Sequence, residues 1–181
     1  TASGRLYASI EEKMLHQFAP FIANTHTETT TSGAAMTLAY HEARKVIKRH
    51  VHANSNDVLI TTGSGMTGAV NKFQRILGLK VSENLKNYTK IPDDLKPIVF
   101  VSHMEHHSNQ TSWYETIADV EVVEGNEEGL ICLENFEKAI LKHKERPIKI
   151  VSVIGGSNVT GIKTDYHKIA ALIHKYNGLC F

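Results

Sequence analysis

Apolar residues recur along the first part of the chain at helical spacing. In residues 6–18 every fourth position is apolar, which places one face of a predicted helix at four positions: Leu6, Ile10, Met14 and Phe18. A polar, hydroxyl-rich segment follows at 23–32, and a second predicted helix runs from 32 to about 50. The last turn of that helix is basic, which suits the negative end of the helix dipole. The N-terminal part of the chain is therefore predicted to be two helices joined by a polar loop.

From about residue 56 the pattern changes to short apolar runs separated by helical stretches. The apolar runs predict four strands and the beginning of a fifth: 57–61, 98–101, 120–123, 148–154 and 179–181. Helices are predicted between them, with a polar surface segment at 82–96: 69–77, 106–115, 133–143, and from the cap at Thr164-Asp165 to Tyr176. Strands that are apolar on both faces and alternate with helices are typical of a buried parallel sheet. The predicted fold class is α/β, a mostly parallel sheet with helices on both faces.

The length of 181 residues suits one domain or slightly more. We expect residues 1–31 to form an N-terminal helix and loop, and residues 32–181 to form part of a larger domain. The last apolar run has three residues, whereas buried strands have about five or more. The chain is therefore expected to be truncated, and a truncated domain that exposes apolar surface is expected to dissolve poorly or associate.

The composition is that of an ordinary globular protein, with 41% hydrophobic and 22% charged residues. A net charge of +1 gives no reason to expect binding to nucleic acid or to an acidic membrane surface. No apolar run approaches the ~18 residues of a membrane span, and no secretory signal is visible. The two cysteines, Cys132 and Cys180, form no disulfide framework. These observations predict a cytoplasmic protein.

A glycine-rich loop follows the first predicted strand. Residues 63–68 read Gly-Ser-Gly-Met-Thr-Gly, which fits the G-x-G-x-x-G pattern of NAD(P)-binding Rossmann domains. That pattern needs an acidic residue at the end of the next strand, about 20 residues on, whereas Glu83 lies in a polar stretch. Backbone N–H groups at Gly65, Met66 and Thr67 lie at the start of a helix, where a phosphate dianion binds well. A loop that binds nothing and a Rossmann-type domain remain as alternatives.

Two further loops with reactive or polar side chains follow predicted strands. Residues 103–109 carry three histidines and a glutamate without the spacing of a zinc site, so no metal is predicted. This segment either caps a helix or lays an imidazole ring on an aromatic cofactor. In residues 155–161, Asn158 offers its amide to a ligand oxygen or bonds to its own backbone. Because ligands of parallel sheets bind beyond the carboxyl ends of the strands, the three loops predict one site.

Several segments, taken in chain order, carry a resemblance to one enzyme family: Ala2-Ser-Gly4, Asn24-Thr-His26, residues 63–71, Met104 to Asn109 with Trp113, Ser157 to Gly161, and Ile169 to Leu172. The chain resembles the large domain of class V aminotransferase-fold enzymes. These are pyridoxal-phosphate enzymes of fold type I, and they include cysteine desulfurases and selenocysteine lyases. The resemblance covers nearly the whole chain, and its most specific parts are the Glu-His-His-x-Asn and Ser-Asn-Val-x-Gly loops.

The resemblance implies that pyridoxal 5'-phosphate is the cofactor. It implies that Met66 and Thr67, beside the N–H of Gly65, hold the cofactor phosphate. It further implies that His106 stacks on the pyridine ring and that Asn158 hydrogen-bonds the ring hydroxyl oxygen. The cofactor supplies the electron sink in such enzymes, and the protein supplies orientation and charge.

The resemblance also implies an amino-acid substrate and a homodimer in which a loop carrying His26 approaches the active site and touches the substrate. A cysteine desulfurase or lyase-like reaction is favoured over an aminotransferase reaction. Residues 27–31 and Gly68 depart from the family pattern. The family's aspartate and Schiff-base lysine are expected beyond Phe181, so the chain alone is expected to be inactive. The alternative is a non-catalytic α/β module that binds a phosphate or a cofactor.

Overall fold

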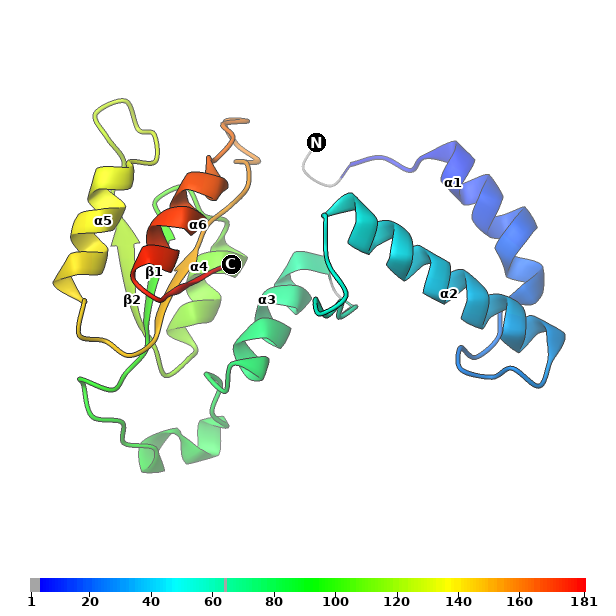
Figure 1. Ribbon diagram of the computed structural model, residues 1–181, viewed down its shortest axis with the longest axis horizontal. Coiled ribbons are helices and arrows are strands. Elements are labelled where there is room, and N and C mark those ends of the chain that lie inside the picture. Colours follow the sequence, from blue (N-terminus) through cyan, green and yellow to red (C-terminus); the bar gives the residue numbers. More distant parts are fainter. Residues whose placement is uncertain (1–3, 64) are drawn as a thin grey trace. The chain divides into compact units, whose positions relative to one another are not determined.

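The computed structural model describes residues 4–63 and 65–181. Of the segments that carry the resemblance, Ala2, Ser3 and Ser64 lie outside the described residues. By its internal contacts the chain divides into two compact parts, an N-terminal unit (Thr1–Thr61) and a sheet unit (Thr62–Phe181), both visible in Figure 1. The division expected after residue 31 stays a prediction.

The first helix of the N-terminal unit changes its geometry along its length. α1 covers Ala8–Lys13 and continues directly into a π-helical turn, η1 (Met14–Phe18), and a 3-10 turn, η2 (Ala19–Phe21). Pro20 within η2 lacks the N–H that a continuing α-helix would need, so the helix ends there. The helix predicted over 6–18 is confirmed, but only its first part is α-helical.

The second helix of this unit, α2, covers Thr31–His50. It begins where it does because the Thr30 side chain accepts a hydrogen bond from the N–H of Gly33 at 3.1 Å, which satisfies one of the free donors of the first turn. Three basic residues, Lys48, Arg49 and His50, occupy its last turn. The predicted helix is confirmed over its whole length.

The strand predicted over 57–61 does not form, and these residues have an irregular conformation. A strand is stable only where a neighbouring strand satisfies its backbone N–H and C=O groups. Within the part of the chain that the structure describes, no strand pairs with this segment, and the Val58 side chain is 80% exposed. The expectation of a strand at 57–61 is therefore wrong, because this apolar segment has no neighbouring strand among the described residues to pair with.

Four parallel strands form the sheet of the second unit, in the spatial order β2-β1-β3-β4. Their bounds are β1 Ile98–Ser102, β2 Asp119–Val123, β3 Lys149–Ser152 and β4 Leu179–Cys180. Phe181 continues the pairing of β4, since its N–H donates to Val151 O at 2.7 Å and its carbonyl accepts from Val153 N at 3.0 Å. The predicted α/β fold class is confirmed.

Helices connect the strands and lie close to their predicted positions. Their bounds are α3 Gly65–Ile76, α4 His107–Tyr114, α5 Leu133–Lys142, α6 Tyr166–Lys175, and a 3-10 helix, η3 Glu83–Tyr88, within the segment predicted to lie on the surface. α3 starts four residues before the predicted Ala69, at Gly65. Residues 65–68 of the glycine-rich segment therefore form the first turn of α3 itself rather than a connection leading to it.

The alternation of side chains along β1 divides the core into two layers. Ile98 and Phe100 pack with Val151 against residues of α5 and α6 (Phe136, Ala139, Ile140, Ile169, Leu172, Ile173). On the other face Val99 and Val101 pack against residues of α3, α4 and the chain after α3 (Phe73, Leu77, Leu79, Trp113). Every residue of β1 is buried, as expected for a central strand covered on both faces. Helices therefore cover both faces of the sheet, as predicted.

Candidate functional site

A cavity of about 390 Å³ lies in the sheet unit at the edge where the parallel strands end. Residues from the start of α3, the loop after β1, the loop after β3 and the end of β4 line it. Met66, Thr67, His106 and Asn158 all contribute to the lining. The three loops that follow predicted strands therefore meet at one cavity, as parallel-sheet topology requires.

The start of α3 presents backbone donors at one side of this cavity. Gly65 has a φ of +62°, a left-handed conformation that glycine adopts without strain. Apart from its chain neighbours and the backbone of its own helix, no described atom lies within 4 Å of the place where a Cβ of Gly65 would be. The N–H groups of a first helical turn have no partner within the helix, and the first turn of α3 carries no acidic side chain. This end of the cavity therefore suits an anion such as a phosphate group.

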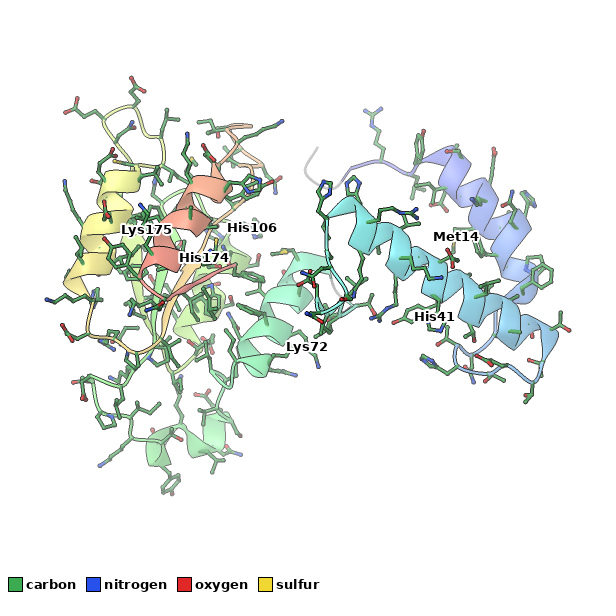
Figure 2. All side chains as sticks on the ribbon, in the orientation of Figure 1. Met14, His41, Lys72, His106, His174 and Lys175 are labelled. Carbon is green, nitrogen blue, oxygen red and sulfur yellow. The ribbon has the colours of Figure 1, made fainter. Side chains whose placement is uncertain are left out.

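His106 lies at the N-terminal end of α4, on the sheet unit, where Figure 2 labels it. Its Nδ1 accepts the backbone N–H of Ser108 at 3.1 Å and lies 2.9 Å from the Ser108 hydroxyl. Since the backbone group can only donate, Nδ1 carries no proton and the proton of the neutral ring is on Nε2. The ring thus caps a helix and lines the cavity at the same time. The two interpretations of the histidine-rich segment do not exclude each other.

Asn158 lies in a tight turn after β3, and the neighbouring serine makes the hydrogen bonds of that turn. The Ser157 hydroxyl accepts the N–H groups of Val159 and Thr160, both at 3.2 Å. Gly161, at a φ of +74°, closes the turn. Within the described part of the chain no protein group is hydrogen-bonded to the Asn158 amide, which remains available to a ligand oxygen. The interpretation that Asn158 bonds to its own backbone is therefore wrong.

The end of β4 supplies an aromatic wall. Phe181 lines the cavity and stacks on Phe73 of α3, with ring centroids 4.5 Å apart and an interplanar angle of 10°. Burial raises the pKa of the preceding thiol, Cys180, so the thiol stays protonated at neutral pH and is a poor nucleophile. Phe181 and Phe73 therefore give this side of the cavity an apolar surface.

Glu105 also lines the cavity, although the sequence patterns gave it no role. Its carboxylate accepts hydrogen bonds from the Asn109 amide at 2.7 Å, from the Ile154 N–H at 2.9 Å and from the Ser102 hydroxyl. Glu105 precedes the N-cap of α4, so the spacing rule for side chains on one helix does not indicate its contact with Asn109. The contact with Ile154, 49 positions away, has no signal in the sequence.

The remaining predicted site residue, implied to touch the substrate, is not among those that line this cavity. His26 belongs to the N-terminal unit, where it has a φ of +72° and its N–H donates to the Thr37 hydroxyl at 3.0 Å. Across residues 4–63 and 65–181, no three His, Cys, Asp or Glu side chains are grouped so as to hold a metal ion. None of the helices in the same ranges is long and apolar enough to cross a membrane.

The sequence profile of one family, described as Aminotransferase class-V, matches residues 1–181. A probable cysteine desulfurase from Halalkalibacterium halodurans is 30% identical over 161 residues, which are 87% of this chain and 36% of that protein. The cysteine desulfurase SufS of Plasmodium falciparum is 27% identical over 163 residues, which are 87% of this chain and 27% of that protein. The chain thus spans about a third of the length of these relatives.

Solved structures share the fold of the chain. A NifS-like protein from Rickettsia africae matches with a TM-score of 0.71 and 18% identity, over 98% of this chain and 44% of that protein. The cysteine desulfurase CsdA from Escherichia coli matches with a TM-score of 0.67 and 20% identity, over 99% of this chain and 42% of that protein. The sheet and its helices are therefore those of a known fold.

Proposed function

Because the chain belongs to the aminotransferase class-V family, we propose that its sheet unit binds pyridoxal 5'-phosphate as part of a cysteine desulfurase. The observation that carries the proposal is the meeting of three loops at one cavity, which combines an anion site, an imidazole ring and a free amide. Two of the similar proteins are named cysteine desulfurases, which favours desulfuration of cysteine over amino transfer as the reaction. Lyase and aminotransferase activities are the alternatives within the family.

The groups that line the cavity fit this cofactor chemically. The first turn of α3, with the hydroxyl of Thr67, offers several donors to a phosphate dianion. His106 offers a flat ring whose orientation its bonds to Ser108 fix, and Asn158 offers an amide N–H to a ring oxygen. A cavity of about 390 Å³ falls in the size range of small-molecule sites.

Pyridoxal phosphate, when bound, supplies an electron sink for the bonds of an amino-acid substrate. The residues of this chain orient the group and do not react with it. The α3 turn would hold the phosphate end, His106 would lie against the ring, and Asn158 would donate an amide N–H to the ring hydroxyl oxygen. We expect the lysine and the aspartate of the family outside these 181 residues, so that the chain alone is inactive.

The alternative of an NAD(P)-binding domain receives no support from the acidic residues of the sheet unit. The acidic side chain nearest to the end of the strand that follows the glycine-rich loop is Glu105. Its two carboxylate oxygens already accept hydrogen bonds from three protein donors. It therefore has little capacity to bind the hydroxyl groups of a ribose.

The proposal extends to features that the sheet unit does not contain. A homodimer in which His26 reaches the substrate of the active site is part of it, and the only support for it is the resemblance to the family that the match over residues 1–181 identifies. A location in the cytoplasm is part of it as well, supported by the two free cysteines, Cys132 and Cys180.

Fluorescence titration of the 181-residue chain with pyridoxine 5'-phosphate tests the cofactor site. This compound lacks the aldehyde and cannot form adducts with surface lysines, and Trp113 is the only tryptophan of the chain. We expect saturable quenching, and binding of pyridoxine without phosphate weaker by on the order of 100-fold, since charge-assisted hydrogen bonds are lost. Thr67→Val should weaken binding about 10-fold, whereas Thr89→Val, at an exposed position, should not change it.

Two outcomes would contradict the proposal. Equal affinity for the compounds with and without phosphate would contradict the proposal that the start of α3 binds the phosphate group. Saturable binding of NADH, unaffected by the substitution at Thr67, would support the dinucleotide alternative instead. The coding sequence after Phe181 tests the enzymatic part, since the proposal expects an aspartate within a few codons and a lysine further on.

A further inference from the structure

A single carboxylate joins three separate segments behind the cavity. One oxygen of Glu105 accepts the Ile154 N–H at 2.9 Å and the Ser102 hydroxyl, and the other accepts the Asn109 amide at 2.7 Å. These partners lie at the end of β1, in the first turns of α4 and after β3. All three are donors, which an ionised carboxylate, an acceptor at both oxygens, can satisfy together.

The orientation of the Asn109 amide is fixed from its other side. Its oxygen accepts the Trp113 indole N–H at 3.3 Å and the Ser152 hydroxyl at 2.6 Å. An indole N–H can only donate, so the Asn109 oxygen must face Trp113 and its nitrogen must face Glu105. The direction of every hydrogen bond from Trp113 to Ile154 is thereby determined. The two bonds that the Asn109 oxygen accepts, from Trp113 and Ser152, are buried, so water does not compete for them.

This network lies next to the residues proposed to flank the cofactor ring. His106 follows Glu105 directly in the sequence, and Asn158 lies four residues after Ile154, which Glu105 binds. Glu105, Asn109 and Ile154 themselves line the cavity. Their hydrogen bonds therefore determine how far the loop after β1 lies from the loop after β3.

We propose that Glu105 and Asn109 are positioning residues that set the width of the ring-binding slot between His106 and the loop at 154–158. The inference rests on the proposed function for the identity of the ring. It assigns specificity for a planar pyridine ring to Glu105 and Asn109, which do not hold the phosphate. The start of α3, which holds the phosphate end, makes none of the hydrogen bonds of this pair. The pair should thus affect recognition of the ring and leave recognition of phosphate unchanged.

A reciprocal exchange of the two side chains tests the proposal. In Glu105→Gln the introduced amide nitrogen faces a donor, either the Asn109 amide or the Ile154 N–H, so one hydrogen bond is lost and two donors oppose each other. Adding Asn109→Asp moves the carboxylate to the other position, where it accepts from the introduced glutamine, Ser152 and Trp113. The double variant has the charge and the number of hydrogen bonds of the natural chain. Glu115→Gln, at the exposed end of α4, is the matched control.

Binding is measured with pyridoxine 5'-phosphate and, separately, with inorganic phosphate, by the quenching of Trp113 and by displacement. We expect Glu105→Gln to weaken binding of the pyridine compound by about 10-fold or more, with phosphate binding changed less than about 2-fold. The double variant should restore the affinity to within about 3-fold, and Glu115→Gln should bind as the natural chain does. Trp113 emission should shift in Glu105→Gln and return in the double variant, since the indole N–H ends the network.

Several results would overturn the proposal. Unchanged ring affinity in Glu105→Gln would do so, as would equal losses of ring and phosphate affinity, which indicate a merely structural role. A double variant that stays weak, or that does not fold, would show that the bond directions are not as assigned. If the natural chain binds no pyridine compound, the proposed function fails separately. The network is then judged by Trp113 emission alone, and an unchanged spectrum in Glu105→Gln overturns it.

Discussion

Both units of the chain contain helices with apolar residues at helical spacing, and the two units bury these residues to very different extents. In the sheet unit α5 buries Ile140 completely against β1. In the N-terminal unit α2 buries only Gly33 and Thr37, and its Ile47 is 44% exposed. No hydrophobic side chain in the described residues 4–61 is buried, and Figure 2 shows the side chains of α1 and α2 spread around their helices.

The difference shows what periodicity can and cannot predict. An apolar face predicts that a segment forms a helix, but burial depends on a second apolar surface of matching shape. The sheet supplies that surface to α5 and α6 through the residues of β1 and β3. Residues 4–61, the described part of the N-terminal unit, contribute no strand to a sheet, so the helices there depend on caps and on local hydrogen bonds such as that of Thr30.

Hydrogen exchange should show the largest difference between the units. The amides of residues 58–60 are not paired in a sheet, whereas those of β1 are protected by the global stability of the sheet unit. We therefore expect the amides of residues 58–60 to exchange at least about 1000-fold faster than those of β1. Mass spectrometry of peptides covering 57–61 and 98–102 measures both, with β3 as a second protected control. Equal protection of the two segments would show that residues 57–61 are paired.

Substitution of one isoleucine in each unit should give the next largest difference. Ile140→Ala removes a fully buried side chain of α5 and should lower the free energy of unfolding by about 2–5 kcal/mol. Ile47→Ala, the matched control on α2, should change it by only about 0.5 kcal/mol. Urea unfolding followed by circular dichroism measures both. A comparable loss in the two variants would mean that α2 is packed against a surface.

Removal of a helix cap should have a smaller effect. Thr30→Ala deletes the acceptor for the Gly33 N–H and should destabilise α2 by about 1 kcal/mol. Thr30→Ser, which keeps the hydroxyl, is the control and should behave as the natural chain. Circular dichroism, which reports helix content, and hydrogen exchange of the first-turn amides of α2 measure the change. An unaltered Thr30→Ala variant would show that the cap does not hold the start of α2.

The smallest effect is a pH dependence of α6. A hydrogen bond from the Lys168 ammonium lowers the pKa of Asp165 below its ordinary value of 3.8. Since the pKa is lowered in the folded chain, the stabilisation is complete above about pH 4 and is lost as the pH falls through the lowered value. The Asp165 carboxylate also caps α6 by accepting the Lys168 N–H at 3.4 Å. The protection of the first amides of α6, measured relative to the intrinsic exchange rate at each pH, should therefore decrease below pH 4. Asp165→Asn should abolish that decrease.

The sequence alone predicted most of the sheet unit, because its strands are short apolar runs bounded by turns and its helices have regular spacing. It also predicted that three loops share one cavity, because the carboxyl ends of parallel strands lie at one edge. It did not predict the absence of the strand at 57–61, since pairing depends on a neighbour rather than on the run itself. The functional roles of Met66, Thr67, His106 and Asn158 stay predictions.

The contribution of Glu105 could not be predicted for a similar reason. Its partners lie between 3 and 49 positions away, and only the folded sheet brings the ends of β1 and β3 together. A pattern of residue types shows that a carboxylate is present but does not show which donors surround it. Networks that join loops of distant sequence therefore emerge only from the fold.

The position of β1 at the centre of the sheet has a consequence for synthesis of the chain. Both strands that pair with β1 come later in the sequence, and residues 103–148 separate β1 from β3. At about 5–20 residues per second, a ribosome needs roughly 2–10 s to add those residues. During that interval the apolar strand Ile98–Ser102 has an unpaired edge that can join a strand of another nascent chain. The central, fully buried strand of the folded sheet is thus the one whose backbone groups are without a partner for this interval of synthesis.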